Sequence, residues 1–400
     1  MVAIGKQLRR RGIDVVISLA EPYADVAQAA DLQVESVFSR ERFDELLGDA
    51  DVWKPIRGMR RVLGQVAAQF LSQHNDVIRK HHRPGQTILI SHPLDFASCV
   101  FRESDPSTPL VDVHLAPATL RVPSSPGRLS PWWFEIRRPT WAVKASYWAA
   151  DRLFLDPTLT PSVGKLRDQY GLPKINRYLD QWWLSPDRIL AMFPEWFAPA
   201  TSTVLTQLMH VGFPLADLAP ESDDTLERLQ RLQLNRPVIF TAGTAHHHCG
   251  EFFRRAVEAC DRLRCGGILL STHGENIPNP LPQGIVHATY APLGQLLAHA
   301  SAIVHHGGIG TTSQSLAAGV PQVIRANAFD QFDNATRVQR LGCGRWLKRD
   351  RQLTDMLDHV RRDAGVASAC DAVKRQLSTD PETSGAEAAA IEIESMLSRL

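Results

Sequence analysis

The feature that most constrains the fold is a regular alternation of short apolar runs with longer amphipathic stretches. In the first half, the runs at residues 13–17, 87–90, 110–113 and 189–193 have the length of buried strands, and residues 59–80 show a helical pattern. Strands that are apolar throughout are typical of parallel sheets covered by helices on both faces. The alternation therefore predicts an α/β protein with parallel sheets.

A second series of the same kind begins near residue 236. It predicts strands at 237–241, 267–271, 302–305 and 322–324, and helices at 251–263, 293–298, 311–318 and 331–341. Between the two series, Gly212, Pro214 and Pro220 lead into the charged stretch 221–228, which has the composition of a linker. A chain of 400 residues is long enough for two cores. We expect one domain at 1–215, a second at 236–380 and a terminal helix at 381–400.

Composition limits the partners and the compartment. The formal net charge is +1, so no overall field attracts nucleic acid or an anionic membrane. The six cysteines form no CxxC pair, which favours reduced thiols. We find no apolar run of the ~18 residues that a membrane-spanning helix needs, and no secretory signal at the N-terminus. We therefore expect a cytoplasmic protein without a transmembrane segment.

Tryptophans are concentrated in one stretch of the first half. Six of them lie between residues 132 and 183: Trp132, Trp133, Trp141, Trp148, Trp182 and Trp183. We expect such aromatics to pack a core or line an apolar pocket rather than to anchor the protein to a membrane.

The start of the chain departs from the usual order of a doubly wound domain. Residues 2–11 already have a helical pattern, and Gly12 ends it before the first apolar run. A doubly wound domain normally opens with a strand whose following loop faces the ligand. We expect that first strand to be missing here, and the first domain to be less stable and less active for it.

The strongest functional signal is a glycine-rich turn between a strand and a helix. The apolar run 302–305 is followed by His306, Gly307, Gly308, Gly310, Thr311 and Thr312, then a short helix closed by Gly319 and Pro321. Glycines let the backbone approach a bulky anion, and the free N–H groups at a helix start bind phosphate. The threonine hydroxyls and the His306 imidazole are further donors. The sequence predicts a phosphate site at His306, Gly308, Gly310, Thr311 and Thr312.

Two other nucleotide-binding motifs fit the sequence less well than this phosphate site. Gly308-x-Gly310 resembles part of the dinucleotide fingerprint G-x-G-x-x-G, with Asp330 further on, but Ser313 occupies the third glycine position. A P-loop would require G-x-x-x-x-G-K-[ST], which does not occur. A glycine turn beside a core histidine is the structural alternative.

Neighbouring loops are expected at the same edge of the sheet. Asp330 and Gln331 offer a carboxylate and an amide to sugar hydroxyls, although Asp330 also suits a helix N-cap. Gly243 and Thr244 follow the strand at 237–241, and Tyr290 offers a ring to a base. Residues 246–248 are three consecutive histidines, which rarely bind one ion, so we predict no metal site. His92 and His114 end strands in the first half and either face an acceptor or serve the structure.

The second half resembles the UDP-glycosyltransferase superfamily with the two-domain GT-B fold, and most closely its bacterial branch. The resemblance rests on five segments in order: 240–244 (FTAGT), 290–292 (YAP), 304–312 (VHHGGIGTT), 318–321 (AGVP) and 330–335 (DQxxNA). Weaker similarity extends through residues 193–196 and 212–215, and through 4–12 near the start. The resemblance implies two Rossmann-like domains whose parallel sheets face a central cleft, with the acceptor bound by the first domain.

The same resemblance implies roles for individual residues. It assigns the diphosphate to Gly243, Thr244, His306, Gly308, Gly310, Thr311 and Thr312, the nucleoside to Tyr290 and Gln314, and the sugar to Asp330 and Gln331. Two positions depart from the family pattern: Leu293 stands where relatives often have Gln, and Gln314 where many have Glu. Both departures leave open whether the nucleoside is uridine or thymidine. The family's catalytic base lies in the loop after the first strand, so no residue is assigned that role.

The predicted function is inverting, metal-independent transfer of a hexose from a nucleotide sugar, UDP-sugar first, to a hydroxyl of a small or lipophilic acceptor. The nucleotide sugar is the co-substrate, and no other cofactor and no nucleic acid partner are expected. The first alternative is a nucleotide-sugar-binding protein, or inactive fragment, without a competent base. A sugar-nucleotide epimerase is the second, although the acid and base carboxylates it needs are not found.

Overall fold

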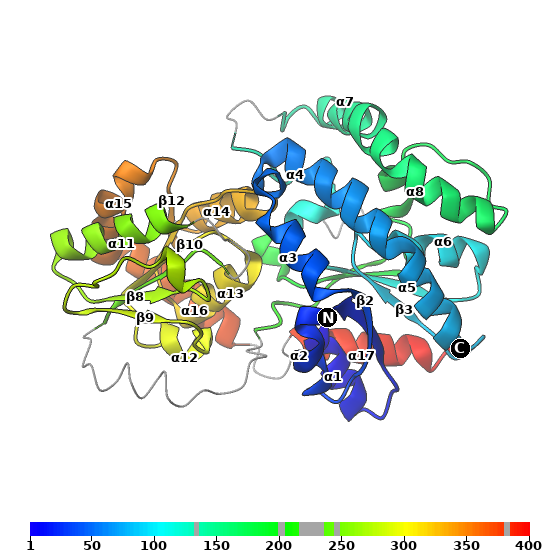
Figure 1. The fold of residues 1–400 in the computed structure, drawn as a ribbon, viewed down its shortest axis with the longest axis horizontal. Helices are drawn as coiled ribbons and strands as arrows, with labels where there is room; N and C mark the ends of the chain where they lie inside the picture. The colour runs from blue at the N-terminus through cyan, green and yellow to red at the C-terminus, as the bar shows by residue number, and fades with distance from the viewer. Residues whose placement is uncertain (132–135, 199–204, 216–235, 244–248, 380–384) are drawn as a thin grey trace. The chain divides into compact units, whose positions relative to one another are not determined.

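The computed structural model describes residues 1–131, 136–198, 205–215, 236–243, 249–379 and 385–400. The chain divides into two compact units, one of Met1–Pro214 with Thr383–Leu400 and one of Leu215–Glu382. Both are α/β, as Figure 1 shows. The terminal helix α17 (Gly385–Leu397) belongs to the first unit, where it packs against α1 (Val2–Arg10). Arg11 reinforces this contact with an ion pair to Glu394 at 2.8 Å.

The second unit is built on one six-stranded parallel sheet, in the order β12-β11-β10-β7-β8-β9. Its strands are β7 (Val238–Thr241), β8 (Gly267–Leu270), β9 (Ile285–Ala288), β10 (Ala302–His305), β11 (Gln322–Ile324) and β12 (Gly344–Trp346). The expected strands at 237–241, 267–271, 302–305 and 322–324 are confirmed within one residue at each end.

Side chains of the central strands alternate between two helical layers, because successive residues of a strand point to opposite faces. Ile239 and Ile303 pack with α12 (Leu293–Leu297) and its neighbours. Phe240 points the other way, 6.4 Å from the ring of Phe252 on α11 (Gly250–Leu263). The strands are therefore buried on both faces, as their continuous apolar sequence predicts.

The remaining helices of this unit complete the two layers. Helix α15 (Leu353–Arg362) lies beside α11, and α13 (Ile309–Ala318) packs between α12 and α16 (Ala364–Ser378). Helix α14 (Gln331–Arg340) contacts α13 and β12. Gly319 ends α13 with a φ of 72°, the left-handed cap that its position predicts.

The first unit contains two separate parallel sheets. Four strands pair in the order β3 (Leu89–Ser91), β4 (Leu110–His114), β5 (Arg188–Ala191) and β6 (Leu208–His210). The strands β1 (Val16–Ala20) and β2 (Gln33–Phe38) pair only with each other. In the described ranges, β1 is thus not hydrogen-bonded to β3.

The expected strand at 13–17 begins three residues too early. The chain leaves α1 through Gly12, with a φ of 78°, and the Ile13 N–H donates to the Leu8 carbonyl at 3.1 Å. These capping bonds hold the chain in a turn, so pairing starts only at Val16. Ile13 and Val15 pack against the core instead.

Helices cover both faces of the four-stranded sheet. Helix α1 and α17 bury Ile4, Leu8 and Ala389 on one face. On the other, Phe96, Leu159 and Trp182 share a core. The helices of this unit are α2 (Ala24–Gln28), α3 (Arg40–Gly48), α4 (Pro55–Arg61), α5 (Ala67–His81), α6 (Phe96–Ser104), α7 (Thr140–Ala150), α8 (Asp156–Gln169) and α9 (Tyr178–Trp182). Among the helices described, we find none long and apolar enough to cross a membrane.

Candidate functional site

The candidate site of the second unit lies where the strand order reverses. From β7 the chain moves outward through β8 and β9, and then returns to β10 on the other side of β7. In open parallel sheets, ligands bind at the carboxyl ends of the strands at such a point. The loops that follow β7 and β10 contain Gly243 and His306–Gly308, and this places two of the predicted segments together.

The His306 ring lies between two glycines from these loops. A Cβ built on Gly243 would lie 2.8 Å from Cε1 of His306, and one on Gly308 would lie 2.5 Å from Nε2. Gly243 also has a φ of 85°, a conformation that side chains disfavour. The two glycines therefore fix the position of the imidazole, and neither tolerates a larger residue without moving it.

His305 serves the structure of the glycine loop. It is fully buried, and burial lowers its pKa to about 3, so the ring is neutral. The Gly307 N–H donates to Nδ1 at 3.1 Å, so Nε2 carries the proton and donates to Oε1 of Gln322 at 3.0 Å. This pair ties the end of β10 and its loop to β11. His305 and His306 point to opposite sides because they are consecutive at a strand end.

Helix α13 begins at Ile309, two residues earlier than expected, with Gly308 at the N-cap position. Glycine has no side chain to cap the helix, so the first N–H groups of α13 lack the partner that a capping side chain supplies. A Cβ on Gly310 would meet no atom within 4 Å, so space is open beside the first turn. An open, uncapped helix start is a binding site for an anion.

The two threonines of this turn differ in exposure. Thr312 is fully buried, and its hydroxyl has no hydrogen-bond partner among the residues described. Thr311 stays partly exposed, and its carbonyl accepts from the Ser315 hydroxyl at 2.7 Å. Thr311 is therefore the hydroxyl that faces solvent. Thr244, expected beside it, lies outside the described residues, as do the histidines 246–248.

Asn334 connects α14 to the glycine loop, although the sequence did not identify it as a site residue. Its side-chain amide donates to the Gly307 carbonyl at 2.9 Å and to Oδ2 of Asp330 at 2.8 Å. Asp330 does not cap α14 with its side chain, and burial raises its pKa to about 6. A carboxylate that is costly to ionise beside an anion site is the kind of group expected at a functional position.

Gln331 shapes the loop that precedes α14. It is buried, and its Oε1 accepts from the N–H groups of Asn327 and Ala328 at 2.9 and 3.0 Å. The loop it holds includes Phe329, whose φ of 53° is unusual for a side-chain-bearing residue. The amide nitrogen of Gln331 is the part of the side chain that this network leaves for a sugar.

Tyr290 and Gln314 lie further along the same edge. Tyr290 follows β9, two strands from β7, which corresponds to about 10 Å at the usual strand spacing. Its ring is 38% exposed, so a base can stack on it. Gln314 is half-buried on α13, the helix against which α12 packs. Tyr290 lies three strand positions from β10, which the glycine loop follows, or about 14 Å at the usual strand spacing.

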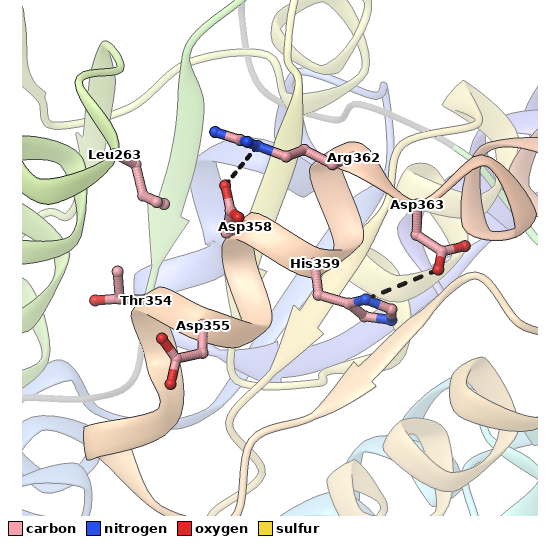
Figure 2. A pocket seen from close by; sticks show the side chains of 7 residues that line it. All are labelled: Leu263, Thr354, Asp355, Asp358, His359, Arg362 and Asp363. Atoms are coloured by element: carbon pink, nitrogen blue, oxygen red, sulfur yellow. Dashed lines mark ion pairs between the residues drawn. The ribbon is translucent and has the colours of Figure 1, made fainter.

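The hollow in Figure 2 is a different feature of the second unit. It measures about 510 Å³ and is lined by Leu263 of α11 and by Asp355, Asp358, His359, Arg362 and Asp363 in and after α15. Its charges are paired internally, with Arg362 2.7 Å from Asp358 and His359 3.8 Å from Asp363. None of these residues belongs to the loops at the strand-order reversal.

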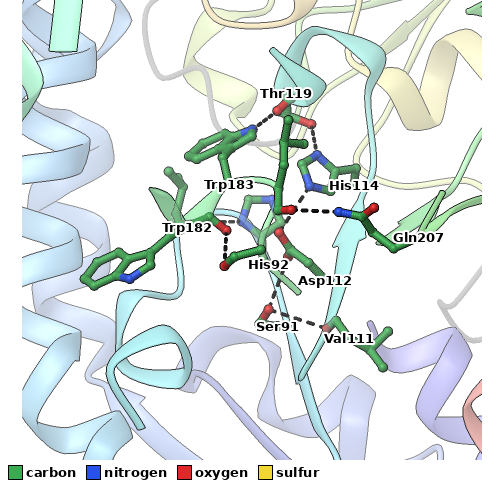
Figure 3. Close-up of polar contacts among 12 residues, drawn as sticks. Ser91, His92, Val111, Asp112, His114, Thr119, Trp182, Trp183 and Gln207 are labelled. Atoms are coloured by element: carbon green, nitrogen blue, oxygen red, sulfur yellow. Dashed lines mark hydrogen bonds and ion pairs between the residues drawn. The ribbon is translucent and has the colours of Figure 1, made fainter. Parts of the chain in front are cut away.

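A second polar cluster lies in the first unit, at the ends of β3 and β4 (Figure 3). His114 is fully buried with both ring nitrogens engaged: Nδ1 lies 2.9 Å from the Thr119 hydroxyl and Nε2 lies 3.1 Å from Asp112. The Ser91 hydroxyl donates to the other oxygen of Asp112 at 3.2 Å. His114 is therefore structural, the second of its two expected roles.

His92 is placed differently. It is partly exposed, and its Nδ1 accepts from the Leu94 N–H at 3.3 Å, so a neutral ring carries its proton on Nε2. Burial lowers the pKa of His92, although Asp112 opposes the shift. Over the described ranges, no hydrogen-bond partner of Nε2 is found in the first unit. Of the two histidines, His92 is the one that is partly exposed.

The described residues contain no group of three His, Cys, Asp or Glu side chains that could hold a metal ion. At the strand-order reversal, the N–H groups of the helix start and the His306 ring are candidate donors for an anion.

Sequence comparison connects the second unit to known proteins. Residues 268–392 match the family model described as erythromycin biosynthesis protein CIII-like, C-terminal domain. Demethyllactenocin mycarosyltransferase of Streptomyces fradiae is 32% identical over 174 residues, 37% of this chain and 38% of the relative. A sterol 3-beta-glucosyltransferase of Aspergillus fumigatus is 37% identical over 117 residues, 24% of this chain and 8% of the relative. The chain thus spans well under half the length of these relatives.

Structural comparison extends the similarity of the fold to the whole chain. The glycotransferase of kitacinnamycin superposes with a TM-score of 0.72 at 17% identity, over 99% of this chain and 95% of that one. A spinosyn rhamnosyltransferase, solved with thymidine diphosphate, gives 0.65 at 18% identity, over 98% and 95%. These neighbours confirm the α/β fold expected from the sequence. Residues 268–392 are thus similar to the erythromycin biosynthesis protein CIII-like C-terminal domain, and the chain has the GT-B fold of the solved glycosyltransferases.

Proposed function

We propose that the chain is a cytoplasmic glycosyltransferase that moves a hexose from a nucleotide sugar to a hydroxyl of a small or lipophilic acceptor. The proposal rests on the open, uncapped start of α13 and on the His306 ring, which Gly243 and Gly308 hold in place beside it. These groups suit a diphosphate, and the named activities of the curated relatives are sugar transfers.

Stabilisation of the leaving group follows from the same site. When the glycosidic bond to the sugar breaks, negative charge develops on the departing diphosphate. The N–H groups of the first turn of α13, the hydroxyl of Thr311 and the His306 imidazole are fixed donors for that charge. Preorganised donors of this kind are usually the largest contribution to catalysis, and they need no metal ion. We therefore propose metal-independent transfer in which the acceptor oxygen, losing its proton to a base, bonds to the anomeric carbon from the side opposite the departing diphosphate, with inversion.

The nucleoside would stack on Tyr290 and hydrogen-bond to Gln314. A UDP-sugar is our first choice, and a dTDP-sugar is the second, because a structural neighbour was solved with thymidine diphosphate. The sugar hydroxyls would meet Asp330 and the amide nitrogen of Gln331. Asp330 binds hydroxyls best as the carboxylate, so binding should strengthen as the pH rises through about 6.

We assign the proton-accepting role, left open by the sequence, to His92. A general base must be neutral at working pH and must have a free nitrogen, and His92 meets the first condition because burial lowers its pKa. For a proton from the acceptor hydroxyl to reach Nε2, the ring must carry its own proton on Nδ1. The bond from the Leu94 N–H would then have to open, which its length of 3.3 Å makes inexpensive.

Two measurements separate transfer from binding alone. Calorimetry with UDP and dTDP tests the donor site, and mass spectrometry of reactions with UDP-glucose or dTDP-glucose and phenolic, sterol or macrolide acceptors tests transfer. We expect binding of one nucleotide and transfer that falls ~10²–10⁴-fold in His92→Ala. Tight binding without transfer to any acceptor would support the alternative of a nucleotide-sugar-binding protein. Absence of binding to either nucleotide would refute both.

His114→Gln is the matched control for His92→Ala. Both ring nitrogens of His114 are hydrogen-bonded, so the substitution should lower the thermal midpoint of the protein rather than abolish transfer. A pH profile of kcat at saturating nucleotide sugar distinguishes the two variants, because donor binding through Asp330 does not limit the rate there and loss of the base removes the acidic limb. Retention of that limb in His92→Ala would show that another residue is the base.

A further inference from the structure

Helix α7 of the first unit exposes an unusual amount of aromatic surface. Trp141 is 72% exposed and Trp148 is 54% exposed, whereas Trp182 and Trp183 are buried in the core. The one side chain that α7 buries fully is Val143. The expectation that the tryptophans fill a core or pocket therefore holds for one pair and fails for the other, while Trp132 and Trp133 lie outside the described residues.

Two exposed tryptophans and a lysine share one side of the helix. Trp141, Lys144 and Trp148 are separated by three and four positions, the spacing of neighbours on a helix surface. The chain continues without a break into η5 (Asp151–Leu155), where Leu153 is 68% exposed and Phe154 is 48% exposed. A helix that is apolar on its outer side normally packs against another surface.

The charges on this surface have a single sign. Lys144 and Arg152 are exposed, and Arg138 just before α7 is exposed as well. The two carboxylates of the segment are buried: Asp151 pairs with Arg121 at 2.7 Å, and Asp156 accepts from the Arg177 N–H at 2.8 Å and lies 4.0 Å from Arg152. An outer surface with aromatic rings, aliphatic side chains and cations, but no exposed carboxylate in the segment, complements a negatively charged apolar boundary.

We propose that this surface, the α7 face (Trp141, Lys144, Trp148 and Arg152), docks on the surface of an anionic lipid bilayer, with Leu153 at its border. The tryptophan rings enter the boundary between headgroups and acyl chains, and the cations contact the anionic headgroups. The helix would lie in the plane of the bilayer and not cross it. The α7 face belongs to the first unit, whereas the nucleotide site is assigned to the second.

A lipid surface fits these observations better than a protein partner. Protein interfaces of this size usually combine apolar contacts with hydrogen bonds and charges of both signs at the rim. The α7 face offers cations alone around its aromatic centre. Membrane-binding helices commonly carry Lys or Arg on the polar side and Trp, Phe or Leu on the apolar side.

The test is co-sedimentation of the full chain with phosphatidylcholine vesicles, with and without phosphatidylserine. We expect binding that requires phosphatidylserine and weakens at high salt. Trp141→Ala/Trp148→Ala should reduce the partition coefficient at least about tenfold, and Lys144→Gln/Arg152→Gln roughly 25-fold, at about fivefold for each cation. UDP affinity, measured in parallel, should not change in either variant and reports that the fold is intact.

Matched controls remove similar groups elsewhere in the first unit. Tyr23→Ala deletes an aromatic ring that is 49% exposed, and Arg42→Gln/Arg79→Gln deletes two exposed cations. Neither should alter vesicle binding by more than about twofold, since surface changes away from an interface are nearly neutral. Equal losses in the controls and in the α7 variants would overturn the proposal, as would no binding to phosphatidylserine vesicles at low salt. A dimer that Trp141→Ala/Trp148→Ala dissociates, in the absence of vesicle binding, would assign the face to a second copy of the chain instead.

Discussion

Replacement of Gly310 by alanine separates what the unliganded fold needs from what the ligand needs. Gly310 lies in the first turn of α13 in an ordinary helical conformation, and an added Cβ would meet no atom within 4 Å. Nothing in the fold therefore requires glycine at this position. Alanine in a helix is favoured over glycine by roughly 0.5–1 kcal/mol, so Gly310→Ala should raise the stability of the second unit by about that amount.

The same substitution should weaken nucleotide binding. The space that a Cβ would fill lies beside the free N–H groups of the helix start, where we place the diphosphate. If the phosphate is displaced enough to lose one hydrogen bond to a charged group, the cost is ~1.5–3 kcal/mol, roughly 10- to 150-fold in Kd. Stability and affinity should thus move in opposite directions in a single variant.

Calorimetric titration with UDP and dTDP, together with a thermal unfolding scan, measures both effects. Gly164→Ala is the control, because Gly164 lies within α8 of the first unit and its added Cβ would come no closer than 3.9 Å to Thr160. It should stabilise the first unit by a similar amount with no change in nucleotide affinity. Unchanged affinity in a folded Gly310→Ala protein would refute the placement of the diphosphate at this turn.

Three further predictions concern the same site. His306→Ala should weaken UDP binding by ~1.5–3 kcal/mol in calorimetry because it removes a donor to a charged group, and unchanged affinity would remove His306 from the site. Because its pKa is raised to about 6 when folded, Asp330 binds its proton more tightly in the folded state and costs stability as the pH rises from about 4 to 6. Asp330→Asn should therefore raise the free energy of unfolding by up to about 3 kcal/mol at pH 7 and by much less at pH 4. A gain of equal size at both pH values would contradict the raised pKa of Asp330. EDTA should leave UDP binding and transfer unchanged, because N–H donors supply the positive potential, and a loss that Mg²⁺ restores would refute metal independence.

The fold could be predicted where an element is marked by a continuous run of one kind of residue. Strands such as β7 and β10 are continuous apolar runs because both of their faces are covered, so they were found to within one residue. The strands β2, β9 and β12 contain Glu35, His287 and Arg345, and they lie at or near sheet edges, where one face or one end is solvated. Their apolar pattern is interrupted, and no expectation was formed for them.

The candidate site was predictable in its backbone and less so in its side-chain roles. Glycines and helix starts are local features, so the loop at His306–Gly310 follows from a single segment. The pairing of His305 with Gln322 and the bonds from Asn334 join residues that are 17 and 27 positions apart in the sequence. Which of two adjacent histidines faces the ligand depends on the direction in which the strand ends, and that direction is set by the sheet.

The two tryptophan pairs illustrate the same limit. Trp182 and Trp183 are buried in the core with Phe96 and Leu110, whereas Trp141 and Trp148 lie on a helix that buries little. Composition alone does not distinguish these environments, because all four residues are equally apolar. The difference arises from how far each helix lies from the sheet.

The most direct test of the account is an experimental structure of the protein with UDP or dTDP bound. We predict the diphosphate at the start of α13, with phosphate oxygens within about 2.7–3.2 Å of backbone N–H groups in residues 308–311 and of the His306 ring, and the base against Tyr290. A nucleotide bound in the hollow beside α15, or one whose phosphates do not touch the first turn of α13, would contradict the central claim.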